Sequence, residues 1–408
     1  MTDIMDDFVV ELAPNDWVKS DEIIKVMGVG GGGCNAVNTM YHKGISGCSF
    51  IVCNTDSMAL ANSPVSVKIQ MGKGLGAGTD PIKGRKAALE SQEEIQVKAL
   101  NPHTQMLFIT AGMGGGTGTG ATPVIAKMAK DKGILTIAVV TLPFLNEGPK
   151  ALTRAVDGIK ELEKNVDSLI VINNEKLYEY DKELIHDAIP LADEVVCTAV
   201  KGIIEIIKKP GYINVDFEDV KTMMRDSGMA LMGYGSGTGK NRIHDAVEGA
   251  FRSPLLNDFE LKSARNVLVN ITVGRNEQGL TMGEMNQLNN LIDEYTGGAN
   301  NFKRGLIYED DPDFGDRVSI TSIVTGLKFK DVVGPVRDLG NYIMLTRDFV
   351  YDREKEASEE GIHLDFVSPG SSNGYGKFNC ELKEEPALLS ATLDQLSNLE
   401  DIPAIRRK

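Results

Sequence analysis

The sequence has 408 residues, of which 42% are hydrophobic and 25% charged, a composition ordinary for a water-soluble protein of about two domains with tails. A net charge of −15 argues against general nucleic-acid binding, which requires a basic surface. No apolar run approaches the roughly twenty residues of a membrane span, so we expect no direct insertion into a bilayer.

The N-terminus and the cysteines favour a cytoplasmic location. The N-terminal stretch MTDIMDDFVVELAPNDW is acidic and lacks the basic-then-apolar order of a signal peptide. The cysteines show no CxxC spacing, and the five histidines show no metal-ligand spacing. We therefore expect no protein-bound metal and reduced thiols at Cys34, Cys48, Cys53, Cys197 and Cys380.

Short apolar runs alternate with longer amphipathic segments along the first half of the chain. Strands are expected over residues 23–27, 50–53, 106–110, 135–140 and 168–172. Strands that alternate with helices predict an α/β fold with a Rossmann-like, doubly wound parallel sheet. Ligands bind beyond the carboxyl ends of the strands in such sheets, so the loops at that edge form the candidate site.

Three of these loops are rich in glycine, and two shorter polar loops accompany them. They are GVGGGGCNAV (28–37), GKGLGAG (72–78) and AGMGGGTGTGA (111–121), with NTD (54–56) and PFLNEG (143–148). A bare turn from strand to helix lets backbone N–H groups approach an anion at the positive end of the helix dipole. Pro123, just beyond the third loop, fits a first-turn helix position. Three such loops at one edge predict a nucleotide with several phosphates.

Other glycine motifs in the chain suggest different functions. GVGGGG satisfies GxGxxG and is followed by Asp56 near a ribose-binding position, so a dinucleotide-binding oxidoreductase is an alternative. That alternative leaves the third glycine loop without a role, because one pyrophosphate needs one such turn. GSGTGKN (235–241) lacks both the first glycine and the final hydroxyl of a P-loop.

The second half of the sequence predicts a long helix and a further αβ region. The helix is expected from about 186 to 208, and the αβ region has strands at 266–274 and 318–327 with a helix near 281–295. Between them, Asp216 and Asp219 are spaced as helix N-capping residues are, and capping is their ordinary role. Beyond about 331 the sequence is typical of a tether, although 342–351 has the pattern of local structure.

The motifs together resemble those of FtsZ, the tubulin-like GTPase family of bacterial cell division. They are GVGGGG-x-NAV, NTD, GLGAG, AGMGGGTGTGA-x-PV, PF-x-x-EG, NVDFEDV, SPLL and a terminal IPA-x-R-R. The resemblance covers Ile23 to Gly326 and the last nine residues. It implies a tubulin/FtsZ fold with an N-terminal tail (1–22), a GTP-binding domain (23–185), a central helix (186–209), a C-terminal α+β domain (210–330), a tether (331–398) and a partner-binding peptide (399–408).

The resemblance also implies which residues bind GTP or GDP. Phosphates would be held by the first and third glycine loops, closed over by the second, while a glutamate contacts the ribose and two residues contact the guanine. The first loop would contribute Gly31, Gly32, Gly33, Cys34 and Asn35, and the third would contribute Gly116, Thr117, Gly118, Thr119 and Gly120. The second loop would contribute Gly76, Ala77 and Gly78. Glu147 would contact the ribose, and Asn174 and Asp193 would contact the guanine. Mg²⁺ would be bound through the phosphates.

Catalysis in the implied mechanism requires a second subunit. Asn214, Asp216 and Asp219 would enter the nucleotide site of the next molecule and orient the attacking water. Such a contact builds head-to-tail filaments, which in this family form the ring at the division site of the cell. The peptide 399–408 would bind membrane-tethering and regulatory division proteins.

The sequence departs from the family pattern in three places. The loop before Gly76 is about four residues short. Ala151 replaces an arginine that many relatives carry near the phosphates, although Arg154 lies one helical turn away. Ile189 replaces a phenylalanine that packs against the base, a loss worth about 1–3 kcal/mol of stacking. These departures leave open a scaffold or regulator that binds GTP with weak or no hydrolysis.

Overall fold

The computed structural model describes residues 22–174, 185–209, 211–213, 215–252, 256, 259–277, 279–299, 301–326, 328–329, 342–346 and 349–352. The chain divides into two compact units, residues 1–340 and 341–408. In the second unit the described residues form one hairpin, β14 (Tyr342–Thr346) and β15 (Phe349–Asp352), within the stretch predicted to have local structure. The peptide 399–408 lies outside the described residues.

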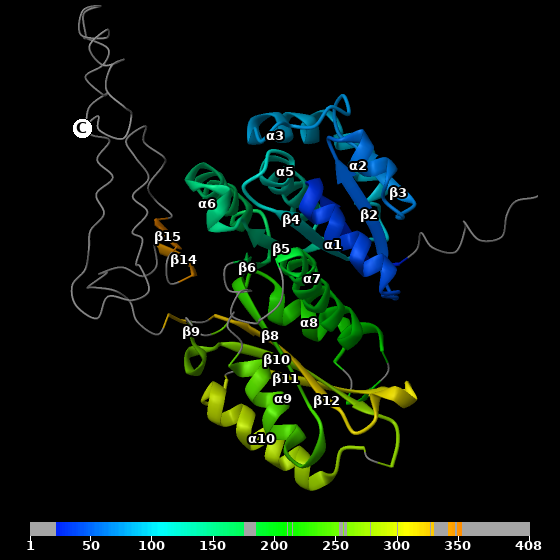
Figure 1. The fold of residues 1–408 in the computed structure, drawn as a ribbon, viewed down its shortest axis with the longest axis vertical. Helices are drawn as coiled ribbons and strands as arrows, with labels where there is room; N and C mark the ends of the chain where they lie inside the picture. Colours follow the sequence, from blue (N-terminus) through cyan, green and yellow to red (C-terminus); the bar gives the residue numbers. More distant parts are fainter. Residues whose placement is uncertain are drawn as a thin grey trace, which may run out of the picture. The chain divides into compact units, whose positions relative to one another are not determined.

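Six parallel strands form the first half of the larger unit (Figure 1). Their order is β3-β2-β1-β4-β5-β6, and the prediction of a doubly wound parallel sheet is confirmed. The order reverses between β1 and β4, which is where doubly wound sheets bind ligands. The strands are β1 (Ile24–Val29), β2 (Ser49–Asn54), β3 (Val67–Gln70), β4 (Met106–Gly112), β5 (Leu135–Leu142) and β6 (Ser168–Asn173).

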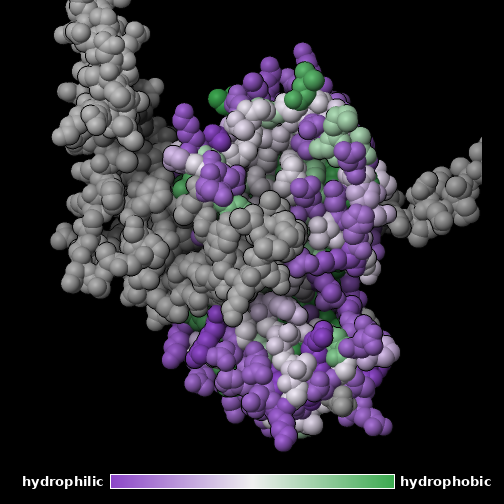
Figure 2. Space-filling model, in the orientation of Figure 1, coloured by the Kyte–Doolittle hydropathy of each residue, from purple (hydrophilic) through white to green (hydrophobic). Residues whose placement is uncertain are grey.

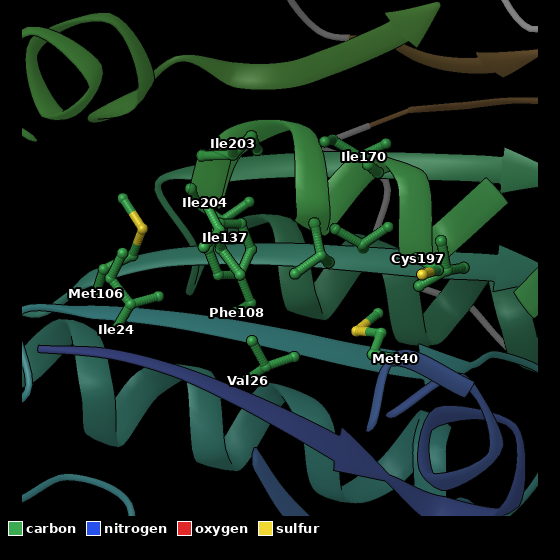
Figure 3. Packing of buried hydrophobic residues seen from close by; sticks show 14 of the residues in the cluster. Ile24, Val26, Met40, Met106, Phe108, Ile137, Ile170, Cys197, Ile203 and Ile204 are labelled. Carbon is green, nitrogen blue, oxygen red and sulfur yellow. The ribbon is translucent and has the colours of Figure 1, made fainter. Parts of the chain in front are cut away.

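Apolar side chains cover both faces of this sheet because successive residues of a strand point to opposite sides. Val26, Phe108 and Ile137 belong to the core cluster shared with α1 and α7 (Figure 3). Their neighbours Ile109 and Ala138 are also fully buried, and α5 packs on β4 and β5. The helices of this half are α1 (Gly30–His42), α2 (Ser57–Ala61), α3 (Pro81–Glu90), α4 (Gln92–Lys98), α5 (Thr117–Asp131) and α6 (Pro149–Glu163).

The long helix α7 (Ile185–Lys208) runs antiparallel to the strands that it covers. Figure 3 shows its Ile203 and Ile204 on the side where the strands begin, with Cys197 nearer the arrowheads. At its end, Lys208 Nζ lies 2.6 Å from Oε2 of Glu22, just before β1. A helix of 24 residues spans about 36 Å at 1.5 Å per residue, so α7 connects opposite edges of the sheet.

The second half continues the same sheet in the order β8-β12-β10-β11-β7. Only three residue pairs, from Ser168 with Gly228 to Ile170 with Ala230, join β6 to β8. Helix α9 packs on β8 and β12, and α10 packs against α9 (Figure 1). The elements are β7 (Gly211–Ile213), α8 (Phe217–Met224), β8 (Gly228–Gly237), α9 (Arg242–Phe251), β9 (Phe259–Glu260), β10 (Asn266–Gly274), α10 (Met282–Thr296), β11 (Asn301–Glu309), β12 (Val318–Thr325) and β13 (Lys328–Phe329).

One local prediction is wrong, and several elements are not predicted from the sequence. Pro123 lies inside α5, in its second turn, because the helix already begins at Thr117 within the glycine motif. The elements that are not predicted include β8, α9 and β11. Strand β8 reads GMALMGYGSG, and its glycines are required by the close packing of α9: a Cβ on Gly233 would lie 1.8 Å from the carbonyl oxygen of Ala250.

Candidate functional site

The first glycine loop leads from β1 directly into α1. A Cβ on Gly28 would lie 2.3 Å from the carbonyl oxygen of Gly33, and one on Gly33 would lie 2.1 Å from that of Thr110, so both positions exclude a side chain. Gly31 is different, because it is exposed and a Cβ there would have nothing within 4 Å. The backbone of the first turn is therefore accessible from outside. Asn35 is likewise exposed.

Cys34 points away from that open side. Its Sγ is buried and donates to the carbonyl oxygens of Gly28 and Cys53, each at 3.6 Å. Burial raises the pKa of the thiol to about 12, so the group is an uncharged packing residue. Cys34 can therefore approach a ligand through its backbone N–H alone. Cys34, Cys48, Cys53 and Cys197 are all free thiols.

The third glycine loop places the start of α5 against the start of α1. A Cβ on Gly30 would lie 2.8 Å from the amide nitrogen of Gly118, and one on Gly118 would lie 2.4 Å from the carbonyl oxygen of Gly112. Neither helix has an acidic residue in its first turn or a side-chain cap at its N-cap residue. Two positive helix ends with uncapped N–H groups therefore lie side by side, which favours an anion.

The second glycine loop packs on α5 from the other side. A Cβ on Gly116 would lie 2.8 Å from that of Ala77 and 2.7 Å from the amide nitrogen of Asp80. Gly120 is equally confined, since its Cβ would lie 1.9 Å from the carbonyl oxygen of Pro81. Gly76 and Gly78 have positive φ, and a Cβ on either would have nothing within 4 Å. We call the edge made by these three loops the glycine-rich edge.

Hydroxyl groups link the loops of this edge. The Oγ1 atoms of Thr55, in the loop after β2, and Thr117 lie 2.6 Å apart and are buried. Thr119 Oγ1 accepts a hydrogen bond from the Gly114 N–H at 2.8 Å. Gly76 N–H donates to the Thr55 carbonyl oxygen at 2.9 Å. The threonines of the motif are therefore used to hold the loops in place.

Helix α6 contacts the same edge. Arg154 Nε donates to the carbonyl oxygen of Gly114 at 2.8 Å, so its guanidinium is held against the third glycine loop. Ala151 is buried, and its carbonyl oxygen would lie 2.9 Å from a Cβ on Gly114. Lys150 is exposed. Glu147 is also exposed and accepts from the N–H of Phe144 at 2.9 Å.

The residues expected at the guanine lie near the ends of β6 and the start of α7. Oδ1 of Asn174 is buried and has no hydrogen-bond partner among the residues that the structure describes. An orphaned buried amide oxygen costs about 1–3 kcal/mol, which a donor group on a ligand would recover. Burial raises the pKa of Asp193 to about 6. The Ile189 side chain lies outside the described residues.

The two described acids lie at the opposite edge of the sheet. Asp216 is the N-cap of α8, where its Oδ1 accepts from the Asp219 N–H at 2.7 Å within a capping box. At the other end of α8, the Ser168 hydroxyl donates to the Met224 carbonyl oxygen at 2.8 Å, and Ser168 is the first residue of β6. Helix α8 therefore lies where the strands begin, whereas the glycine loops lie where they end. Asn214 lies outside the described residues.

Asp219 has a cationic partner on β11. Lys303 Nζ lies 2.7 Å from Asp219 Oδ1, and this ammonium group lowers the pKa of Asp219. We call Asp216, Glu218, Asp219 and Lys303 together the acidic edge. Asp216 and Asp219 thus do cap the helix, as their spacing alone predicts. Asp219 Oδ2 accepts from the Asp216 N–H at 3.4 Å, and its Oδ1 is paired with Lys303. Within the part of the chain that the structure describes, Oδ2 of the exposed Asp216 is the carboxylate oxygen left for a further donor.

Three residues of the glycine-rich edge and the acidic edge are not predicted from the sequence. Asp80 caps α3 by accepting from the Ile82 N–H at 2.9 Å, and the Asp-Pro dipeptide before a helical pattern signals it. Thr55 lies in the predicted NTD loop, but its partnership with Thr117 requires the folded sheet. Lys303 has no local signal, because its partner lies far away in the sequence.

Comparisons with known proteins agree with this geometry. Residues 23–182 match the Tubulin/FtsZ family, GTPase domain, and residues 228–328 match the FtsZ family, C-terminal domain. A cell division protein FtsZ of Pseudomonas putida is 47% identical over 333 residues, covering 80% of this chain and 81% of the relative. The corresponding protein of Coxiella burnetii is 44% identical over 359 residues, covering 84% and 91%.

Solved structures give the same result. An FtsZ dimer from M. jannaschii has a TM-score of 0.69 at 35% identity, over 83% of this chain and 94% of that one. A CetZ2 from Haloferax volcanii shares the fold, with a TM-score of 0.62 at 20% identity over 75% and 93%. The family, fold and GTPase activity expected from the motifs are confirmed. The chain belongs to the tubulin/FtsZ family of GTPases, in its FtsZ branch of cell division proteins.

Proposed function

We propose that this GTPase of cell division polymerises head to tail and hydrolyses GTP at each junction between subunits. The glycine-rich edge of one subunit binds the nucleotide, and the acidic edge of the next supplies the groups that orient water. The observation that carries this proposal is the placement of the two edges. Ser168 at the start of β6 contacts α8, whereas the nucleotide edge lies beyond the end of that strand, about 20 Å away at 3.3 Å per residue. Asp216 and Asp219 therefore do not reach the nucleotide of their own subunit.

Exposed apolar side chains at both edges support such a contact. Figure 2 shows a described surface that is mostly hydrophilic on the face in view. At the glycine-rich edge, Met58, Leu75 and Ile82 are nevertheless 69%, 91% and 77% exposed. At the other edge, Tyr212 is 77% exposed and adjoins Asn214 in the sequence, and Phe302 adjoins Lys303. Two different apolar patches that meet make a heterologous contact, which extends into a filament when it does not close.

Within the nucleotide site, we propose the ligand roles that the FtsZ resemblance implies for the matching residues. The N–H groups at the starts of α1 and α5 hold the phosphates, with Gly31 providing the open approach. Gly76 to Gly78 close over the γ-phosphate, and Glu147 contacts the ribose. Asp193 accepts from the N1–H and amino groups of guanine, and Asn174 Oδ1 gains a donor. Mg²⁺ would be bound through the phosphates of the nucleotide.

Hydrolysis follows from the completed junction. Asn214, Asp216 and Asp219 orient and polarise a water for attack on the γ-phosphorus, while the glycine loops hold the leaving GDP in line. The hydrogen bond from Lys303 lowers the pKa of Asp219, which acts toward the water as a carboxylate acceptor. Loss of the γ-phosphate then weakens the junction.

In the cell, the filaments form the cytokinetic ring in the cytoplasm at midcell. The peptide LEDIPAIRRK (399–408) binds membrane-tethering and regulatory division proteins, because its apolar core lies between acids and bases after a polar tether. Among the described residues, no helix combines the length and hydrophobicity of a membrane span. Removal of residues 399–408 should leave GTPase activity in solution intact and abolish midcell rings, which microscopy of cells with only the truncated chain tests.

The experiment that tests the shared site is GTPase activity against protein concentration. Activity per molecule should be near zero at high dilution and rise once assembly begins. Two inactive variants provide the sharper test: Asp219→Ala removes an acid, and Gly31→Leu blocks the phosphate site at a position with open space around it. Each should be a poor enzyme alone, and a mixture should recover part of the activity. A rate independent of concentration without recovery would overturn the proposal.

A further inference from the structure

Beyond its pairing with Asp219, Lys303 has N–H donors to which the proposed mechanism gives no role. Its ammonium lies 2.7 Å from Asp219 Oδ1, and its side chain remains 47% exposed although it is paired. An ammonium group has three N–H donors, and one contact to Asp219 leaves the others for a further acceptor. Lys303 also lies close enough to Asp216 for that carboxylate to raise its pKa. If Asp216 and Asp219 enter the nucleotide site of a neighbouring subunit, the charged group of Lys303 enters the same site.

The acids of the acidic edge would by themselves be repelled by a triphosphate. They are the three carboxylates of Asp216, Glu218 and Asp219, and the phosphates carry charge of the same sign. Lys221 Nζ lies 2.7 Å from Glu218 Oε1 and over the ring of Phe217, so this lysine balances Glu218. Lys303 offsets the negative charge of Asp216 and Asp219, the two acids proposed to orient the attacking water.

Helix α6 supplies two cations, Arg154 and the exposed Lys150, next to the third loop of the glycine-rich edge. Arg154 uses Nε on the Gly114 carbonyl oxygen, which holds the guanidinium against the backbone. The neighbouring turn of α6 has the buried and uncharged Ala151. In phosphoryl transfer the charge on the equatorial oxygens must be neutralised, and a cation supplied by a partner molecule accelerates that step strongly.

We propose that Lys303 is a catalytic residue supplied in trans: its ammonium contacts the γ-phosphate of the GTP bound to the next subunit. This inference rests on the proposed shared site, and it adds a cation to the acids. The reaction is unchanged, because the water oxygen bonds to the γ-phosphorus as the bond to GDP breaks. Lys303 stabilises charge and exchanges no proton.

The test compares turnover per assembled subunit in four variants. Lys303→Met keeps the stem and removes the charge, and should lower turnover at least about tenfold with GTP affinity unchanged. The loss should be smaller than for an arginine finger, because an ammonium lacks the planar fork. Lys303→Arg should restore most of the activity. Lys221→Met is the matched control at the same edge, and it should lower turnover much less than Lys303→Met, because Lys221 balances Glu218 and not the acids proposed to orient water.

A mixing experiment shows in which molecule Lys303 acts. Lys303→Met with Gly31→Leu should recover turnover, because the intact acidic edge of the second variant meets the intact nucleotide site of the first. Filaments pelleted with a non-hydrolysable GTP analogue confirm that both variants are incorporated. No recovery in mixed filaments, or failure of Lys303→Met to enter them, would overturn the proposal and leave Lys303 a structural partner of Asp219.

The two proposals fail in different ways. Full turnover by Asp219→Asn would overturn the shared site itself. Loss of turnover by Asp219→Asn together with full turnover by Lys303→Met would overturn only the role of Lys303, and would show that its ion pair merely holds α8 on β11.

Discussion

The hydroxyl groups of Thr55 and Thr117 lie 2.6 Å apart and are buried between the loop after β2 and the first turn of α5. This hydrogen bond connects two strand ends that are separated by β1 in the sheet. The neighbouring Gly76 N–H donates to the carbonyl oxygen of Thr55, so the same residue also holds the second glycine loop. Thr55 therefore fixes two of the loops that surround the phosphates.

Thr117→Val should lower both the stability of the fold and the affinity for GTP. The change keeps the shape of the side chain but leaves the buried Thr55 hydroxyl without its partner, at a cost of about 1–3 kcal/mol. Thr122→Val is the matched control, because Thr122 Oγ1 is buried with no partner among the described residues. That control should be neutral or stabilising. Urea unfolding of both variants measures the difference, and equal losses would contradict it.

Two glycines of the first loop should respond in opposite ways to alanine. Gly33→Ala places a Cβ against the Thr110 carbonyl oxygen and should destabilise the fold by about 3 kcal/mol or more. Gly31→Ala meets open space, so the fold should be unchanged or gain up to about 1 kcal/mol of helix propensity. GTP affinity should nevertheless fall in Gly31→Ala, because the methyl group occupies the approach of the phosphates. Thermal unfolding and nucleotide titration separate the two effects.

The proposed catalytic role of Asp216 can be separated from its capping of α8. Asparagine is as good an N-cap as aspartate, so Asp216→Asn should leave stability unchanged within about 0.5 kcal/mol. Hydrolysis in assembled filaments should fall by about 100-fold, because the carboxylate that polarises water is gone. Asp216→Ala should lose both activity and about 1 kcal/mol of stability. Normal turnover in the asparagine variant would confine Asp216 to capping.

Guanine affinity should depend on pH through Asp193. Burial raises the pKa of this carboxyl to about 6 in the free protein, and guanine requires the charged form as acceptor. Affinity should therefore be highest above pH 6 and fall about tenfold for each pH unit below it. Calorimetry of GDP binding from pH 5 to 8, in roughly half-unit steps, measures this dependence.

Asp193→Asn supplies the control for that dependence. The amide does not titrate, so the pH dependence should disappear and GTP affinity should drop. An amide N–H also donates where a carboxylate cannot, so the variant should favour a base with a carbonyl oxygen in place of the guanine amino group, as in xanthosine triphosphate. Unchanged pH dependence in this variant would place the titrating group elsewhere.

The sequence predicts the nucleotide-binding half well because its signals are local. Apolar runs of strand length, followed by glycine turns, place β1, β4 and their loops within a few residues. The start of α5 is misplaced because Thr117 and Gly118 have poor helix propensity, and packing against Gly112 and Pro81 overrides it. Tertiary contact, which no window of sequence contains, decides that boundary.

The second half shows the same limit more strongly. Strand β8 contains several glycines and reads as a turn, although α9 packs closely on it and requires their lack of side chains. Capping by Asp216 is visible in the spacing of two acids, but the ion pair of Asp219 with Lys303 depends on the pairing of β11 with β7. Long-range partners of this kind determine the electrostatics of the site and leave no pattern in the sequence.

In the filament proposed above, the separation of the glycine-rich edge from the acidic edge gives the two ends different chemistry. One terminal subunit has a nucleotide that no acidic edge reaches, and the other has an acidic edge with no nucleotide to act on. A filament therefore contains one fewer working site than it has molecules, and the terminal GTP outlasts all others. Short filaments are consequently slow enzymes per molecule, and the subunit that retains its GTP marks the polarity of growth.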